Sequence, residues 1–241
     1  MKEERAKNPL YRQFSTEFEK DPASAATRQL ALAVNERFAL QVSDPDTPLL
    51  EVNSPRIVGT GQRLRLTEEL PDVIFVSPYR RNLQTLEGLT TGWPELRQVC
   101  RIYEEERIRE QSHGLAGLYN DWRVFFALYP EQKKLYDSEG SYWYQWPQGE
   151  RVPDVRLRIR SWMNTLTRDF ANKRVMAISH HLTKLALRAN LERWSAEEFQ
   201  RVDRDEKPIN CGVTKYRGLP NLGHNGHFAL EYYNRDFSIY L

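Results

Sequence analysis

Features that define several large classes of protein are scarce in this sequence of 241 residues. It contains only two cysteines, Cys100 and Cys211, which lie far apart and lack the spacing of metal ligands. A disulfide scaffold is therefore not expected, and a reducing compartment is. No apolar run approaches the roughly 18 residues of a membrane-spanning helix, and the charged start, MKEERAKNPL, lacks the apolar core of a signal peptide. These absences predict a cytoplasmic protein with no membrane partner.

A large excess of charge of one sign is also missing. The net charge is +2, so the composition does not favour a nucleic-acid partner. The chain has no internal repeat and no low-complexity tract, and its 40% of apolar residues suffices for a sizeable core. We predict a single domain over residues 1–241, with a helical N-terminal segment at 1–42 and an aromatic loop at 139–150.

The hydrophobic pattern predicts strands that alternate with helices. Two short apolar runs, VIFVS at 73–77 and VMAIS at 175–179, are typical of buried strands, and each is followed by a segment of helical spacing. Helices are expected within 8–40, at about 55–69, 80–91, 117–137, 155–170 and 180–191, and from 195, with a short strand at 99–103 and two strands in CGVTKYRG and HFALEYYN. This order predicts an α/β fold in which helices flank a mostly parallel central sheet.

Charged side chains follow the two buried strands at the points where they end. Arg80 and Arg81 come after the first strand, at the start of a helix whose free backbone amides favour an anion, and His180 follows the second strand in the same way. In parallel sheets, ligands bind beyond the carboxyl ends of the strands. Between the two strands, the acidic segment at 104–118 supplies carboxyl groups, Glu110 among them. Cations that hold oxygens and an acid that protonates a leaving group would suit phosphoryl transfer.

Five segments, taken in order, resemble motifs of the histidine phosphatase superfamily, which includes phosphoglycerate mutases and acid phosphatases. SPYRRNLQT resembles the segment with the phosphate-binding arginine, here Arg81. REQSHG resembles the segment of the general acid, here Glu110, and AISHH resembles the strand end with the second phosphate-pocket histidine, here His180. DTPL at 46–49 and NCGVT at 210–214 resemble two further motifs.

This resemblance implies a phosphoglycerate mutase-like fold and a phosphomonoester phosphatase that works through a phosphohistidine. It implies inorganic phosphate or a phosphorylated small molecule as the ligand, and neither a metal nor an organic cofactor. Mutases and phosphatases share these pocket groups, so the sequence leaves open the choice between them, the substrate and the oligomeric state.

The motif that opens the family, a strand ending in Arg-His-Gly, has no counterpart here, because residues 1–112 contain no histidine. The resemblance implies that this histidine attacks phosphorus. We expect the chain to begin just downstream of the motif, so that the first strand of the sheet is missing and its neighbours lose backbone partners. The alternative is a pseudoenzyme or interaction module that binds phosphate without turnover.

Several charged residues near these motifs have simpler explanations. Arg80 is expected to be a solvated neighbour of the site, and Arg156, Arg158 and Arg160 are expected on the solvated face of a helix. His181 stands where the family has glycine and places an imidazole near the pocket. Metal binding by this residue and the histidine before it is not favoured, because adjacent residues of an extended segment point in opposite directions.

Two further clusters are assigned to structure in preference to function. The aromatic side chains of the 139–150 loop are expected to pack in the core and not to form a lid: they are Tyr142, Trp143, Tyr144 and Trp146. His224 and His227 frame an Asn-Gly pair, which is typical of a turn, so a loop tip is favoured over a zinc site.

Overall fold

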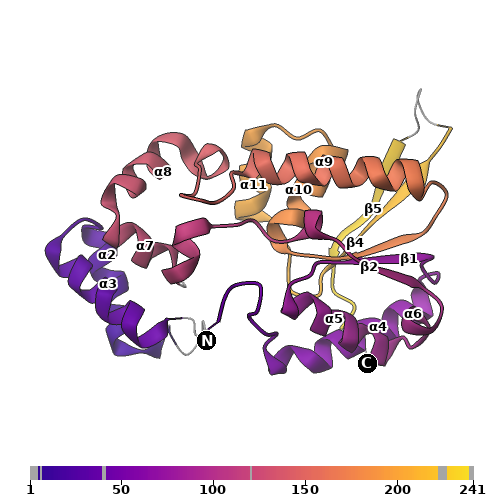
Figure 1. The fold of residues 1–241 in the computed structure, drawn as a ribbon, viewed down its shortest axis with the longest axis horizontal. Helices are drawn as coiled ribbons and strands as arrows, with labels where there is room; N and C mark the ends of the chain where they lie inside the picture. The colour runs from indigo at the N-terminus through magenta and orange to yellow at the C-terminus, as the bar shows by residue number, and fades with distance from the viewer. Residues whose placement is uncertain (1–4, 6, 40–41, 120, 222–226, 239–241) are drawn as a thin grey trace. The chain divides into compact units, whose positions relative to one another are not determined.

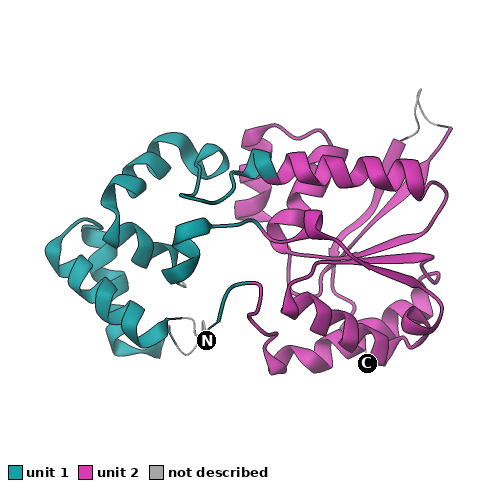
Figure 2. Cartoon of the chain, in the orientation of Figure 1, with its two compact units in different colours: residues 1–44, 111–154 teal, residues 45–110, 155–241 magenta. Residues whose placement is uncertain are grey.

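The computed structural model describes residues 5, 7–39, 42–119, 121–221 and 227–238. The chain divides into two compact units (Figure 2): residues 1–44 with 111–154 form unit 1, and residues 45–110 with 155–241 form unit 2. The single domain over residues 1–241 stays a prediction. The turn predicted around His224 lies outside the described residues. Within the described ranges, no helix has the length and apolar character needed to cross a bilayer.

Unit 1 is helical and has an aromatic core. Its elements are α2 (Pro9–Lys20), α3 (Ala25–Phe38), η3 (Gly114–Tyr119), α7 (Trp122–Leu128) and α8 (Pro130–Trp143). Side-chain caps start three of these helices: Asn8 caps α2, Ser24 caps α3 and Asp121 caps α7. The core consists mainly of aromatic side chains, with Phe14, Phe125 and Phe126 fully buried.

The aromatic segment that follows α8 belongs to this core. Tyr144 and Trp146 are buried and contact each other, with ring centroids 5.2 Å apart. Tyr142 is also buried, whereas Trp143 is exposed, so packing accounts for three of the four aromatic side chains. The helix extends to Trp143 through a non-helical φ of 78° at Gly140, and the irregular segment therefore begins at Tyr144, five residues later than expected.

Unit 2 is an α/β sandwich around a parallel sheet (Figure 1). The strands β1 (Val73–Val76), β2 (Arg101–Glu104) and β3 (Val175–Ile178) pair in the order β2-β1-β3, and both ladders are parallel. The helical elements are η1 (Glu51–Asn53), α4 (Ser54–Thr67), α5 (Arg80–Gly92), α6 (Glu95–Gln98), η2 (Glu106–Ile108), α9 (Val152–Asp169, whose first three residues fall in unit 1), α10 (His181–Leu191) and α11 (Ala196–Asp205). The predicted α/β class with a mostly parallel sheet is confirmed.

The side chains of β1 alternate between two hydrophobic clusters, one on each face of the sheet. Ile74 and Val76 pack with α4, α5 and β3, whereas Val73 and Phe75 pack with α9 and α10. Successive side chains of a strand point to opposite faces, so a strand buried on both sides is apolar throughout. This explains why VIFV has no polar position.

An antiparallel hairpin completes unit 2. The strands β4 (Val213–Leu219) and β5 (His227–Arg235) pair with each other. Through Val213 and Tyr232 they pack against the hydrophobic cluster that contains Ile74 and Val76. In the described part of the chain, β3 pairs with β1 alone. Its residue Ala177 is exposed, although the facing strand β1 is buried at every position.

Helices α4 and α5 approach each other closely at glycines. A Cβ on Gly92 would lie 2.2 Å from the carbonyl oxygen of Val58. Gly92→Ala should therefore lower the free energy of unfolding by about 1–3 kcal/mol through overpacking, measured by urea unfolding. The control is Gly218→Ala in β4, where the nearest contact of the new Cβ would be 3.8 Å away. This substitution should change the free energy of unfolding by less than about 0.5 kcal/mol. Equal effects of the two substitutions would contradict the close contact.

Candidate functional site

Ser77 and His180 meet at the carboxyl ends of β1 and β3. Val76 faces Ile178 across the parallel ladder, and the amide of Ser77 donates to the carbonyl of Ile178 at 2.9 Å. The Ser77 hydroxyl and His180 Nε2 are 2.7 Å apart and form a hydrogen bond. Both side chains are buried. The register of the sheet thus fixes the position of the imidazole.

Arg81 reaches the same place from the first turn of α5. Its guanidinium lies over the ring of Tyr79, 4.7 Å from the centroid. The same ring meets His180 edge to face, with centroids 4.9 Å apart. Arg81 and His180 therefore both contact Tyr79, and the structure brings together the two residues that the sequence placed 99 positions apart. Arg80 is exposed, as expected of a solvated neighbour.

The electrostatics of this site disfavour a positive charge on the imidazole of His180. Burial lowers the pKa of His180 to about 3, and the nearby charges of Arg81 and Arg158 contribute in the same direction. His180 is therefore neutral near pH 7 and can offer one ring nitrogen as a donor and the other as an acceptor.

Two helices start at this edge of the sheet. Tyr79 is the N-cap of α5 and His180 is the N-cap of α10, and among the described residues neither side chain caps its helix. Because β1 and β3 are neighbours, the positive ends of both helices lie at the same edge, where their first backbone amides favour a bound anion.

Glu110 follows η2 and is the last residue of the first chain segment of unit 2. Its carbonyl oxygen accepts a hydrogen bond from Arg158 Nη2 at 3.1 Å, and the carbonyl of Arg109 accepts one from the Thr183 hydroxyl at 2.6 Å. Thr183 lies in the first turn of α10, three residues after His180. The loop backbone next to Glu110 is therefore tied to the helix that begins at His180.

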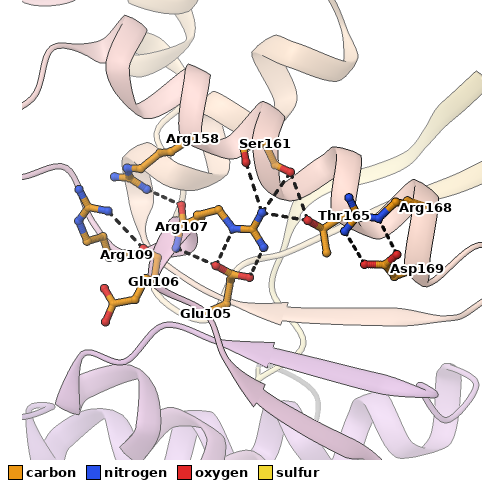
Figure 3. Close-up of polar contacts among 9 residues, drawn as sticks. All are labelled: Glu105, Glu106, Arg107, Arg109, Arg158, Ser161, Thr165, Arg168 and Asp169. Carbon is orange, nitrogen blue, oxygen red and sulfur yellow. Dashed lines mark hydrogen bonds and ion pairs between the residues drawn. The ribbon is translucent and has the colours of Figure 1, made fainter.

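The prediction of a solvated face for the three arginines of α9 is wrong for two of them. Arg158 donates to the carbonyl of Arg107 (Figure 3) and to that of Glu110. Arg156 donates to the carbonyl of Ala189 in the last turn of α10 and to that of Trp194 beyond it. Only the third, Arg160, is exposed. Guanidinium groups with fixed backbone acceptors cannot be told from solvated ones by their spacing along a helix.

His181 takes a different direction from His180. Its Nε2 lies 2.6 Å from Asp203 Oδ1, so it ties α10 to α11. Across the described ranges, no three side chains of the His, Cys, Asp and Glu types are grouped so that they could hold a metal ion. Sequence reasoning did not assign a role to Ser77 or Tyr79, although both stand within the quoted SPYRR segment.

The sequence matches the histidine phosphatase superfamily (branch 1) over residues 33–221. It is 28% identical over 172 residues to the phosphoglycerate mutase-like protein AT74 of Arabidopsis thaliana, and this match covers 67% of the chain and 50% of that protein. It is 27% identical over 107 residues to the broad-range acid phosphatase DET1 of Saccharomyces cerevisiae, with 42% of the chain and 30% of that protein covered. The chain thus spans about half the length of the plant relative that it matches.

Solved structures share the fold at low sequence identity. YhfR of Bacillus stearothermophilus has a TM-score of 0.63 and 21% identity, and the match covers 80% of this chain and 88% of that chain. The mycobacterial glucosyl-3-phosphoglycerate phosphatase, solved in complex with inorganic phosphate, has a TM-score of 0.62 and 20% identity, with 83% and 94% covered. The predicted phosphoglycerate mutase-like fold is confirmed.

The burial of a neutral imidazole makes stability depend on pH. The unfolded chain protonates His180 below its ordinary pKa of 6.5, whereas the folded protein keeps it neutral down to a pH of about 3. The unfolded state therefore binds more protons in this range, and stability decreases as the pH falls through it. Between pH 7 and pH 5, the wild type should lose roughly 2 kcal/mol more than His180→Gln, measured by urea unfolding at both pH values. Parallel losses in the two proteins would show that the imidazole is not held neutral.

Proposed function

The chain belongs to the histidine phosphatase superfamily (branch 1), and from this premise we propose that Arg81, His180 and Glu110 form the phosphoryl site of a phosphomonoester phosphatase. The observation that carries the proposal is the convergence of Arg81 and the buried His180 on Tyr79, where two helices begin. The ligand would be inorganic phosphate or a phosphorylated small molecule. The phosphate complex of the mycobacterial relative supports this class of ligand.

Each residue has a role that its surroundings support. Arg81 presents a planar guanidinium that suits two phosphate oxygens at once. His180 is neutral and can donate one hydrogen bond to a third oxygen. An incoming dianion offsets the positive charges of Arg81 and Arg158, which add to burial in lowering the pKa of this imidazole. Glu110, in its protonated form, is the proposed general acid.

In the proposed reaction, a histidine nitrogen attacks phosphorus and the bond from phosphorus to the ester oxygen breaks. Glu110 transfers its proton to the departing oxygen, which leaves as an alcohol. Water then attacks the phosphohistidine, the carboxylate of Glu110 takes up one proton of that water, and the bond from phosphorus to nitrogen breaks. Arg81 and His180 hold the phosphoryl oxygens through both steps.

The attacking histidine has no candidate in the first 112 residues, which contain no histidine. We propose that it is supplied by an added parallel strand that ends in Arg-His-Gly. The edge of β3 that has no ladder partner among the described residues supports this position, because parallel strands that are neighbours end at the same edge of the sheet, here beside His180. The exposed Ala177 in this strand fits such an addition.

The second candidate function is phosphate binding without turnover, in a pseudoenzyme or interaction module. The absence of histidine from residues 1–112 is the observation that favours it. For either function we place the protein in the cytoplasm, because Cys100 and Cys211 are both free thiols, as expected in a reducing compartment.

Both candidate functions require a phosphate site, and substitution of Arg81 tests for it. Loss of a charge-assisted guanidinium contact in Arg81→Gln should weaken binding of inorganic phosphate by roughly 10- to 100-fold, measured by isothermal titration calorimetry. Arg80→Gln is the matched control, because it removes the same charge from an exposed neighbour and should change the affinity by less than about threefold. Equal weakening by the two substitutions, or no phosphate binding by the wild type at millimolar concentration, would refute the site.

Turnover separates the two candidate functions. A strand-forming segment that ends in Arg-His-Gly, joined ahead of residue 1, should confer hydrolysis of 4-nitrophenyl phosphate, and the same segment with Arg-Gln-Gly should not. Glu110→Gln should slow hydrolysis of an alkyl phosphate by about 100-fold or more and that of the 4-nitrophenyl ester far less, because nitrophenolate needs little help from an acid. Phosphate binding with no hydrolysis by the histidine-bearing protein would favour the binding module.

A further inference from the structure

The loop that carries Glu110 is held by side chains of other elements. The carbonyl oxygens of four successive residues, 107 to 110, each accept a side-chain hydrogen bond: Arg158 Nη1 donates to Arg107 at 2.6 Å, Ser179 Oγ to Ile108 at 2.7 Å, Thr183 Oγ1 to Arg109 at 2.6 Å and Arg158 Nη2 to Glu110 at 3.1 Å. We call these three donors, Arg158, Ser179 and Thr183, the carbonyl clamp. These bonds fix the path of residues 107–110, the first two of which belong to η2, without a β-ladder.

The clamp is built from the elements that form the proposed phosphoryl site. Ser179 directly precedes His180 in the chain, and Thr183 lies in the first turn of α10. Arg158 comes from α9, which packs on the other face of β1 from α5. The clamp therefore fixes the loop relative to the imidazole of His180 as well as to α9.

Arg158 has a particular place in the clamp because one guanidinium binds both its first and its last carbonyl. The planar fork of arginine can hold two acceptors at fixed separation, which an ammonium group cannot do in the same way. The loop has a second anchor on α9 that does not involve Glu110: Arg107 pairs with Glu105 and donates to Thr165 at 2.9 Å (Figure 3). Arg158 is therefore the link between α9 and the far end of the loop.

Resting on the proposed function, we propose that Arg158 is a positioning residue that sets the place of Glu110 beside His180. It contacts neither the substrate nor the reacting atoms in this role. Its charge has a separate effect, because burial and the charges of Arg81 from α5 and Arg158 from α9 together lower the pKa of His180. The hydroxyl of Ser77 and the ring of Tyr79 also contact this imidazole. Arg158→Lys keeps the positive charge but removes the planar fork, whereas Arg158→Met removes both. The two variants therefore separate the effect of the hydrogen bonds from the effect of the charge.

The first experiment measures the clamp in the chain itself by amide hydrogen exchange. The amides of Ile108 and Arg109 donate to the carbonyls of Glu105 and Glu106 at the start of η2. Both should exchange at least about tenfold faster in Arg158→Lys, whereas the NMR titration of His180 should stay close to that of the wild type. Arg158→Met should speed exchange equally and also raise the pKa of His180. Arg156→Lys is the control, because Arg156 binds the carbonyls of Ala189 and Trp194 in the same way and should leave the loop unchanged. Wild-type exchange in Arg158→Lys would overturn the clamp.

The second experiment asks whether the clamp places Glu110 at the phosphate. At pH 8, Glu110→Gln removes a carboxylate beside the bound anion and should tighten inorganic phosphate binding at least threefold in the wild-type background. In the Arg158→Lys background the same substitution should change the affinity by less than about 1.5-fold, because the carboxyl group is no longer held there. An equal effect in both backgrounds would overturn the positioning role even if exchange in the loop is faster.

Failure of the proposed function has a different signature. If the wild type does not bind phosphate at millimolar concentration, the phosphoryl site is refuted and the role given to Glu110 falls with it, while amide exchange still decides whether Arg158 holds the loop. If the wild type binds phosphate and Arg158→Lys changes neither exchange nor the effect of Glu110→Gln, the site stands and the inference about Arg158 is overturned.

Discussion

The parallel pairing of β1 with β3 is the constraint on which the rest of unit 2 depends. Val76 stands opposite Ile178, so both chains leave the sheet at the same level, and the next residues on each side meet as Ser77 and His180. A slip of one residue would turn every side chain of one strand to the other face. The two hydrophobic clusters to which β1 contributes side chains, one on each face of the sheet, would then both lose apolar contacts. The burial of VIFV therefore determines the geometry of the site.

Burial also determines the electrostatic state of that site. A buried imidazole that feels the charges of two guanidinium groups stays neutral, since a third positive charge would have no water to stabilise it. The same positive field, together with the two helix starts, is unfavourable when no anion is present and favourable when one is bound. A site of this kind gains most from a ligand with two negative charges, which agrees with a phosphate dianion better than with a carboxylate.

Much of this arrangement could be predicted from the sequence because it follows from local patterns. The two apolar runs marked β1 and β3, and the positions after them marked Arg81 and His180. The role of Arg158 could not be predicted, because this residue alternates with apolar residues in the same way as the exposed Arg160. Only the fold shows which backbone carbonyls the Arg158 guanidinium contacts. The start of the aromatic segment after α8 was misplaced for a similar reason: Gly140 is typical of a helix end, yet the helix resumes after it because Tyr142 is buried.

The two kinds of group in the proposed site are held by two kinds of structure, and the chemistry explains the difference. Groups that bind phosphate must keep fixed distances to one another, and the sheet with its two helix starts provides this. An acid must approach a leaving group whose size varies with the substrate, so it belongs on a loop, and a loop has no ladder to hold it. Side-chain hydrogen bonds to the four carbonyls of 107–110 give that loop one conformation while leaving its backbone outside the sheet. Because Ser179 and Thr183 flank His180 and Arg158 comes from α9, the loop is held to the strand end and to α9 together.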